Sequence, residues 1–170
     1  MKEIKDIVDA LSVSELVKQN ALSVYQLIAR AESKVHGQTV EEIHFHEVGS
    51  MDAVADVVAV CYLIDRLKVE RIIASPVRVG YGQVHCAHGI LPVPAPAVSV
   101  LTEGIPVYSG NLEGEFCTPT GAALLKYFVS KFGEMPVLRV VKTGYGMGKK
   151  EFEAANCVRA MLAEEEQESQ

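Results

Sequence analysis

The stretch SMDAVADVVAVCYLIDRLKVERIIASPV, residues 50–77, decides the fold class of this chain. Its residues 51–67 are almost wholly apolar and contain neither glycine nor proline, which predicts a buried helix. Ser50 precedes them and is a residue type that caps helix N-termini. Residues 71–77 are rich in β-branched side chains, which predicts a strand covered on both faces. A helix followed closely by a buried strand indicates an α/β architecture.

The alternation of helices and strands continues on both sides of this stretch. Upstream, residues 13–35 repeat apolar side chains at helical spacing, with Ser12 or Ser14 as the cap and Gly37 as the stop. Downstream, the pattern indicates helices at 97–102 and 118–132, an irregular segment at 80–89 and a stiff, proline-rich loop at 91–96. Further short strands are expected at 42–47, 106–108, 137–142 and 156–162.

These elements predict an α/β (or α+β) fold in which a mixed β-sheet packs against helices. Neither an internal repeat nor a linker is visible, so residues 1–163 are expected to form a single domain. The acidic residues 164–170 are expected to be a disordered tail, and the chain itself is expected to be a central piece of a longer protein.

Composition excludes several classes of function. The chain has 170 residues, is 49% hydrophobic and carries a net charge of −6, which gives no sign of nucleic-acid or membrane binding. The large apolar share favours self-association or a missing partner segment. The start resembles no signal peptide, so a cytoplasmic protein is expected. The cysteines lie far apart without a C-x-x-C pair, which disfavours zinc ribbons and disulfide scaffolds and indicates reduced thiols: Cys61, Cys86, Cys117 and Cys157.

The segment His44-Phe45-His46-Glu47 is the strongest candidate for a metal site. Residues two apart in a strand face the same side, so His44 and His46 would converge. Asp52 and Asp56 follow on the helix at a spacing of four, which stacks them on one face. Imidazoles with carboxylates suit zinc, nickel, iron, manganese or cobalt, and the absence of clustered thiolates disfavours copper(I) and iron–sulfur centres.

A plainer interpretation of this segment remains open. The histidines could be partly exposed strand residues, and Asp52 could only favour the helix N-terminus. Asp56 argues against this, because an ionised carboxylate inside an apolar helix is costly unless it is paired or coordinated.

The segment His85-Cys86-Ala87-His88-Gly89 offers two more imidazoles and a thiol between predicted loop residues. Binding groups often lie on such loops, so His85 and His88 could complete the site begun by His44 and His46. They could equally hydrogen-bond backbone groups in an ordinary loop, and their spacing matches no standard motif.

Anion contacts are predicted at a helix start. Thr118, Thr120 and Gly121 open the helix expected at 118–132, where free amides and the helix dipole attract phosphate or carboxylate. A well-capped helix explains the same residues without any ligand, and on local evidence that interpretation is slightly favoured.

Basic residues elsewhere are the other candidates for anion contacts. Arg78, with Tyr81 nearby, could contact an anionic ligand. Lys149 follows the glycine-rich run of residues 144–148, which lacks both the Walker spacing and the dinucleotide fingerprint. A turn joining two strands is the better interpretation of this run. Hydrolase and zincin chemistry is disfavoured, because neither Gly-x-Ser-x-Gly nor His-Glu-x-x-His occurs.

Four ordered blocks of the sequence together resemble one known family. They are HFHEVGSMD at 44–52, AHGILPVPAP at 87–96, TPTGAA at 118–123 and GYGMG at 144–148. The blocks are similar to those of the nickel-insertion proteins that mature the nickel-pincer nucleotide, the cofactor of lactate racemase. The resemblance extends over residues 13–162, nearly the whole chain.

The resemblance implies a CTP-dependent cyclometallase, a lyase that puts nickel into pyridinium-3,5-bisthiocarboxylic acid mononucleotide and forms a nickel–carbon bond. It also implies a divalent cation, Mg or Mn, used with CTP. In this family the CTP site belongs to a C-terminal half that is absent from this chain, and the family's opening strand and turn are missing too. The chain is therefore expected to be the nickel-binding domain of the N-terminal half and to act with that C-terminal half, as a homo-oligomer.

Site roles follow from this resemblance and from the residues themselves. The candidate catalytic residues are His46, Glu47 and Asp52. The candidate metal ligands are His44, His46, Glu47, Asp52, Asp56, His85 and His88. The candidate contacts to the phosphate and carboxylates of the mononucleotide are Arg78, Thr118, Thr120, Gly121 and Lys149. Two alternatives are a non-enzymatic nickel reservoir or assembly module, and a metal-dependent phosphoester hydrolase using the same His and Asp residues.

Overall fold

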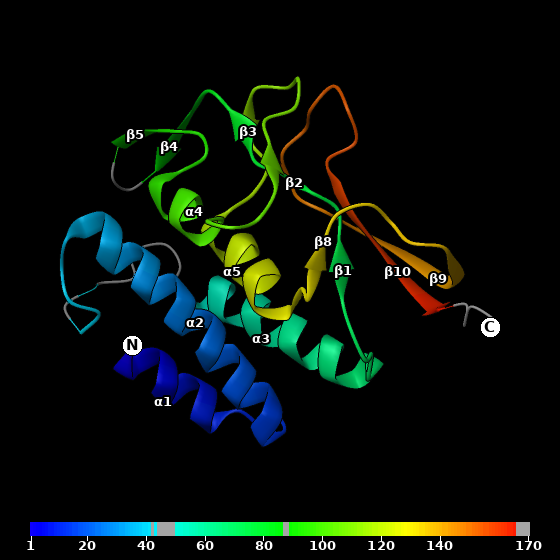
Figure 1. Ribbon diagram of the computed structural model, residues 1–170. Helices are drawn as coiled ribbons and strands as arrows, with labels where there is room; N and C mark the ends of the chain where they lie inside the picture. Colours follow the sequence, from blue (N-terminus) through cyan, green and yellow to red (C-terminus); the bar gives the residue numbers. More distant parts are fainter. Residues whose placement is uncertain (42, 44–49, 87–88, 166–170) are drawn as a thin grey trace.

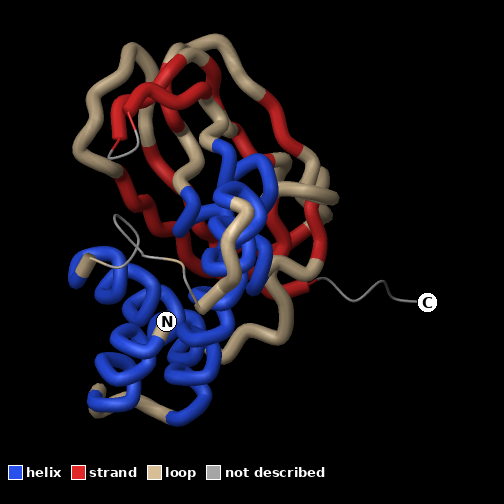
Figure 2. The backbone as a smooth tube through the Cα atoms, turned by 90° about the vertical axis from the view of Figure 1, so that its left-hand side faces the viewer, coloured by secondary structure: helices blue, strands red, loops and turns tan. Residues whose placement is uncertain are grey.

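The structure is a computed structural model that describes residues 1–41, 43, 50–86 and 89–165 (Figure 1). The helices in this part of the chain are α1 (Lys2–Ala10), α2 (Glu15–His36), α3 (Met51–Leu67), α4 (Pro96–Leu101) and α5 (Pro119–Phe128). Figures 1 and 2 show α1, α2 and α3 at one end of the molecule and the strands β2 to β5 at the other. None of the described helices combines the length and the apolar character needed to cross a bilayer.

The boundaries of α2 are set by the residues expected from the sequence. The Ser14 hydroxyl accepts a hydrogen bond from the Val17 amide at 3.3 Å, which satisfies one of the free amides of the first turn. Gly37 ends the helix in the left-handed conformation, with φ of 63°. The predictions of this helix, of its stop and of Ser14 as one of two possible caps are therefore confirmed.

Helix α3 has the predicted bounds but not the predicted burial. Ser50 caps it by accepting a hydrogen bond from the Ala53 amide at 3.3 Å. Only Val54, Val57 and Cys61 are fully buried, and they form one stripe that packs on α2 and α5. The expectation that the whole helix is buried is wrong, because its outer face remains exposed despite its apolar sequence.

The strands pair two by two. The parallel pairs are β1 (Ile73–Ala74) with β8 (Lys131–Phe132) and β2 (Val77–Arg78) with β6 (Val107–Tyr108). The antiparallel pairs are β3 (Gly80–Tyr81) with β7 (Gly114–Glu115), β4 (Gln83–Cys86) with β5 (Gly89–Pro92), and β9 (Leu138–Met147) with β10 (Cys157–Glu165). The predicted class, helices with a mixture of parallel and antiparallel strands, is confirmed.

Several local predictions are wrong. The run 71–77 is not one buried strand, since β1 and β2 are separated at Pro76, which has no amide to donate to a ladder. Residues 80–86 are not irregular but form β3 and β4. Leu91 and Pro92 of the predicted proline-rich loop belong to β5, and Glu164 and Glu165 of the predicted disordered tail belong to β10. The glycine-rich run at 144–147 lies within β9 rather than in a turn.

The predicted end of α5 is also wrong, since the helix stops at Phe128. Residues 131–132 then form β8 instead of a last helical turn. The amide of Ser130 donates to the Ile72 carbonyl at 2.9 Å, so pairing with β1 replaces the helical bonds there.

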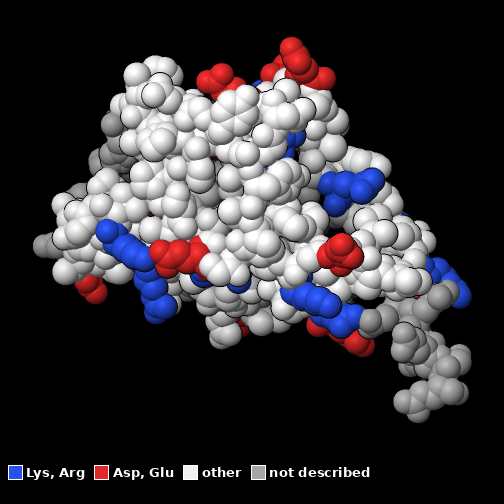
Figure 3. All heavy atoms as spheres, turned by 45° about the horizontal axis from the view of Figure 1, so that its top comes forward, with Lys and Arg blue, Asp and Glu red and all other residues white. Residues whose placement is uncertain are grey.

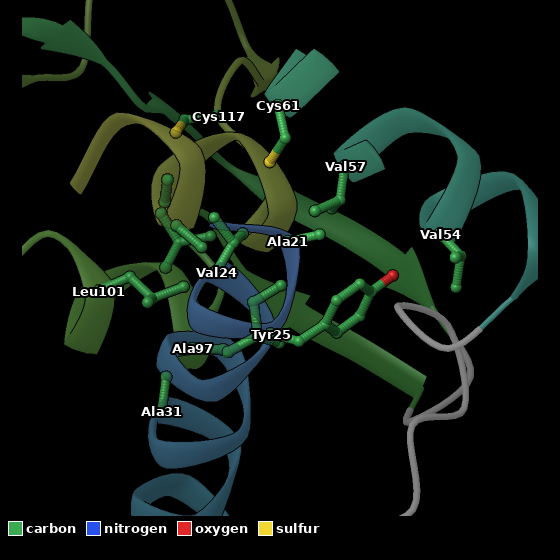
Figure 4. Close-up of a cluster of buried hydrophobic side chains, with 14 of the residues drawn as sticks. Ala21, Val24, Tyr25, Ala31, Val54, Val57, Cys61, Ala97, Leu101 and Cys117 are labelled. Carbon is green, nitrogen blue, oxygen red and sulfur yellow. The ribbon is translucent and has the colours of Figure 1, made fainter. Parts of the chain in front are cut away.

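The core is built from all five described helices and from β2. Figure 4 shows the part of it around Tyr25 of α2. Tyr25 and Ile28 of α2 are its largest fully buried side chains. Cys61 of α3 and Cys117, just before α5, also lie in it, and burial raises the pKa of both thiols to about 11. The nearby charge of Glu115 adds to the shift at Cys117. Both side chains are therefore thiols rather than thiolates at neutral pH and react slowly as nucleophiles.

Alkylation of the folded chain at mildly alkaline pH is expected to discriminate between its cysteines. Cys157 is exposed, so iodoacetamide should modify it rapidly, whereas Cys61 and Cys117 should react only after denaturation. Peptide mass spectrometry of the native and denatured samples gives the order. Modification of Cys61 as fast as Cys157 in the native sample would contradict this description of the core.

Candidate functional site

The candidate metal-binding segment, residues 44–47, lies in the chain between the buried Ile43 and the start of α3. Ile43 has only 6% of its surface exposed, and Ser50 caps α3. The residues between them, His44, His46 and Glu47 among them, lie outside the described residues. Their convergence on a strand at 42–47 therefore stays a prediction.

Asp52 and Asp56 lie in the first turns of α3, and both are exposed. The argument that Asp56 needs a partner because it is buried in an apolar helix is therefore wrong, since the buried stripe of α3 is formed by other residues. The shared helical face of the two carboxylates is as expected. Asp52 remains the described carboxylate that follows the histidine segment most closely.

Tyr25 of α2 is a residue near this region that the sequence did not single out. Its side chain is fully buried, and its hydroxyl points towards the N-terminal part of α3, where Val54 and Val57 lie (Figure 4). Burial raises the pKa of Tyr25 to about 12, and the negative charge of Asp56 adds to the shift. The phenol is therefore protonated at neutral pH and can donate a hydrogen bond near the N-terminal part of α3.

The second group of candidate ligands lies on a different element. His85 is exposed on β4 opposite Ile90, and the half-buried Cys86 pairs with Gly89. His88 lies outside the described residues. In the part of the chain that is described, no group of three or more His, Cys, Asp or Glu side chains is placed to hold a metal. His85 is thus not brought together with Asp52 and Asp56 in such a group.

Arg78 on β2 has an environment that none of the other predicted anion contacts has. Its guanidinium carbon lies 4.1 Å from the centroid of the Phe116 ring, a stacked cation–π arrangement. Nη2 donates to the side-chain oxygen of Asn111 at 3.4 Å, a long bond that a carboxylate or phosphate oxygen could replace. Nε is buried and has no hydrogen-bond partner among the described residues.

Glycines hold the chain tightly around Arg78. A Cβ on Gly110, which has φ of 77°, would lie only 2.4 Å from Nε of Arg78. A Cβ on Gly80 would meet the carbonyl oxygen of Gly114 and would also touch the Phe116 ring. Backbone therefore covers the inner edge of the guanidinium, and the arginine side chain has little freedom to rotate.

Phe152 connects this region to the loop after β9. Its ring lies 4.4 Å from that of Phe116, with an interplanar angle of 34°. The same loop carries Lys149, which is exposed. Arg78, Phe116 and Phe152 therefore form one stack, which we call the arginine stack. Its members are far apart in the chain, so no local sequence pattern indicates it.

The threonine segment behaves as an ordinary helix cap. Thr118 Oγ1 accepts a hydrogen bond from the Gly121 amide at 3.2 Å, and Pro119 occupies the first turn of α5. One of the amides that an anion would use is thus already satisfied by the protein. Thr118 is exposed, and Thr120 and Gly121 are half-buried.

Charge is spread thinly over the face shown in Figure 3. Separate Lys, Arg, Asp and Glu side chains surround a broad uncharged area rather than forming a basic or acidic patch. Such a surface does not suit a polyanion such as nucleic acid, whereas a small anion needs only one or two well-placed donors.

Comparisons with known proteins point in a single direction. A family model described as "Nickel insertion protein" matches residues 1–170. A protein of Clostridium kluyveri named "Pyridinium-3,5-bisthiocarboxylic acid mononucleotide nickel insertion protein" is 45% identical over 166 residues, which cover 98% of this chain and 42% of that protein. A "Putative nickel insertion protein" of Methanococcoides burtonii is 47% identical over 164 residues, covering 95% of this chain and 41% of the relative.

A more distant relative extends the same picture. A protein of Staphylococcus epidermidis with the same name as the Clostridium protein is 38% identical over 170 residues. These residues cover all of this chain and 43% of that protein. The chain thus spans about two fifths of the length of the curated relatives it matches. No solved structure matches it.

Proposed function

Because the chain belongs to the nickel insertion protein family, we propose that it is the nickel-binding part of a protein that inserts nickel into pyridinium-3,5-bisthiocarboxylic acid mononucleotide. The observation that carries the proposal is the match along the whole chain to relatives named for this reaction. In this proposal nickel is the cargo of the protein, which must both capture the ion and release it.

The proposed nickel ligands are His44, His46 and Glu47, with Asp52 as a further candidate. Neutral imidazole and carboxylate are ligands that nickel accepts, and a set without thiolates releases the ion more easily than a closed thiolate cage does. The burial of Cys61 and Cys117 in the hydrophobic core supports a ligand set without thiolates. Asp56, His85 and His88 are secondary candidates.

Titration of the chain with nickel tests this part of the proposal. The expected result is saturable binding of one ion per chain that weakens as the pH falls and imidazoles take up protons. A chain that binds nickel no better than an unrelated protein of similar charge would refute it.

The proposed contact for the mononucleotide is the arginine stack. Arg78 and Tyr108 are register partners in the parallel pair β2–β6, so their side chains lie on the same face. A stacked guanidinium suits the phosphate or a thiocarboxylate, and the Tyr108 ring, 51% exposed, could stack on the cationic pyridinium ring. Lys149 could approach from the loop docked by Phe152. Thr118, Thr120 and Gly121 are weaker candidates, because the Gly121 amide already donates a hydrogen bond to the Thr118 side chain.

Arg78→Met is expected to weaken mononucleotide binding by about 10- to 100-fold, since a charge-assisted hydrogen bond contributes about 1.5–3 kcal/mol. Methionine keeps contact with Phe116 but cannot bind an anion. Arg30→Met, an exposed arginine of α2, is the matched control and should leave binding unchanged. Fluorescence titration with the mononucleotide gives both affinities. Equal affinities for the two variants would exclude Arg78 as the contact.

Finer parts of the proposal rest on the resemblance of the four sequence blocks. They are a lyase reaction that uses CTP with Mg or Mn, maturation of lactate racemase, and a cytoplasmic location. The share of the relatives covered by this chain supports the proposal that CTP is handled by other parts of those proteins. We also propose that the chain works as a homo-oligomer.

The share of the relatives' length that this chain covers also favours an alternative function, that of a nickel store or assembly module. A piece that covers about 42% of its relative could store nickel or assemble the complex without taking part in metal insertion. Reconstitution of the reaction distinguishes the two, because an accessory module changes the supply of nickel but is not required when nickel is abundant.

A further inference from the structure

One edge of the Arg78 guanidinium, that of Nε and Nη2, lies against the turn formed by residues 109–111. The N–H groups of this edge point the same way, so a carboxylate or phosphate can accept from both side by side. In this structure Nη2 donates to the side-chain oxygen of Asn111 at 3.4 Å, which is longer than the usual range for such bonds. Nε is buried and has no hydrogen-bond partner among the described residues. The edge is therefore only half used.

Gly110 lies directly against the same edge of Arg78. A Cβ added to Gly110 would be 2.4 Å from Nε, 2.8 Å from Cζ and 2.9 Å from Nη2. The turn therefore occupies the space in which the oxygens of a bound anion would lie. The amide of Asn111 has one acceptor oxygen, whereas the edge has two donors, so the turn satisfies Nη2 and leaves Nε without a partner. A buried donor of a charged group in this state destabilises the arrangement that contains it.

The turn is held less firmly than the arginine that it covers. Ser109, Gly110 and Asn111 are exposed, and residues 109–113 make no backbone–backbone hydrogen bond with another described residue. The Ser109 hydroxyl donates to the Gly110 carbonyl at 3.3 Å, a bond within the turn. Arg78 instead stacks on the Phe116 ring at 4.1 Å. Moving the turn away therefore breaks, among the hydrogen bonds to described residues, the long bond to Nη2, and it leaves the guanidinium in place.

We infer that Asn111 is an internal competitor at Arg78: its amide oxygen occupies the place of a ligand oxygen in the free chain, and a bound carboxylate or phosphate displaces the turn of residues 109–111. The ligand then accepts from both Nε and Nη2, so the buried donor gains the partner that it lacks. Asn111 thereby selects for groups with two acceptor atoms on one centre, since a single neutral acceptor would only replace the bond that it breaks. The inference rests on the proposed binding of the mononucleotide by Arg78.

Two substitutions of Asn111 test the competition, with affinities for the mononucleotide measured by fluorescence titration. Asn111→Ala removes the competing oxygen and is expected to strengthen binding about two- to tenfold, the range of one hydrogen bond. Alanine fits the backbone there, because the φ of Asn111 is not positive. Asn111→Asp forms an ion pair with Arg78 and is expected to weaken binding about tenfold or more. Asn20→Asp, the matched control, adds the same charge on α2, where Asn20 accepts a hydrogen bond from Tyr127 at 2.9 Å, and should leave binding unchanged.

NMR spectroscopy of the parent chain follows the displacement directly. The Nε–H signal of Arg78, assigned by its loss in Arg78→Met, is expected to shift on addition of the mononucleotide, because Nε gains a hydrogen-bond partner. A signal that stays in place when the chain is saturated overturns the inference. Circular dichroism confirms that each variant is folded.

The titrations separate a failure of this inference from a failure of the proposed function. If Arg78→Met binds the mononucleotide as tightly as the parent chain, the proposed contact is wrong and the inference is wrong with it. If Arg78→Met weakens binding but Asn111→Ala leaves it unchanged or weakens it, Asn111 does not compete and the inference alone is overturned. Equal affinities of Asn111→Asp and Asn20→Asp overturn it as well.

Discussion

Gly80→Ala is expected to cost the fold about 3 kcal/mol or more and to abolish mononucleotide binding by the arginine stack. Gly80 has φ of 89°, which an alanine adopts only with strain. Its added Cβ would also overlap the carbonyl oxygen of Gly114, at 1.8 Å. Because the obstacle is backbone, β3 and β7 must separate, and Phe116 moves with β7 and takes away the ring on which Arg78 stacks.

Gly104→Ala is the matched control for this change. Gly104 has a similar φ of 82°, but a Cβ there meets nothing within 4 Å. Gly104→Ala should therefore lower the free energy of unfolding only by the backbone strain, about 1–2 kcal/mol, and leave mononucleotide binding intact. Chemical denaturation gives the free energies of unfolding, and titration with the mononucleotide gives the affinities. Equal stability of the two variants would contradict the tight packing of β3 on β7.

The double variant His44→Ala/His46→Ala is expected to lower the nickel affinity of the chain by about 100-fold or more, since changes even to the outer shell of metal sites cost 10–100-fold. His36→Ala is the matched control, because His36 is exposed at the end of α2 and pairs with Glu32 at 3.4 Å. Calorimetric titration of nickel into the parent and both variants measures the change. If the double variant kept the parent affinity, nickel would have to be held elsewhere, with His85 and His88 as the next candidates.

Helix boundaries could be predicted because their signals are local. Ser14 and Ser50 each accept a hydrogen bond from an amide three residues on, and Gly37 adopts the left-handed conformation that ends α2. Each signal depends on the next few residues alone. The same reasoning failed at the end of α5, where a bond from Ser130 to the distant residue Ile72 decides the structure.

Short strands and the arginine stack could not be predicted from local sequence. Strands such as β2 and β6 are two residues long, and their pairing depends on segments far apart in the chain. The sequence identifies Arg78 only as a positive charge, because its contacts with Phe116 and Asn111 exist only in the folded chain. The prediction that Asp56 is buried is wrong because an apolar helix sequence does not reveal which of its faces is covered.

Family membership was the feature that the sequence predicted best. The four blocks that resemble nickel-insertion proteins are spread from residue 44 to residue 148, and the family match over residues 1–170 confirms the resemblance. Physical chemistry alone left five metals open at His44 and His46. The names of the relatives favour nickel among them.

Reconstitution of nickel insertion tests the central proposal most directly. The chain, the part of the Clostridium kluyveri relative outside the matched region, and their mixture would each be given excess nickel, CTP, Mg and the mononucleotide, and incorporated nickel would be measured by mass spectrometry. Insertion is expected in the mixture and in neither part alone. Insertion by the remainder of the relative alone, at the rate of the mixture, would contradict a direct role of this chain in the reaction.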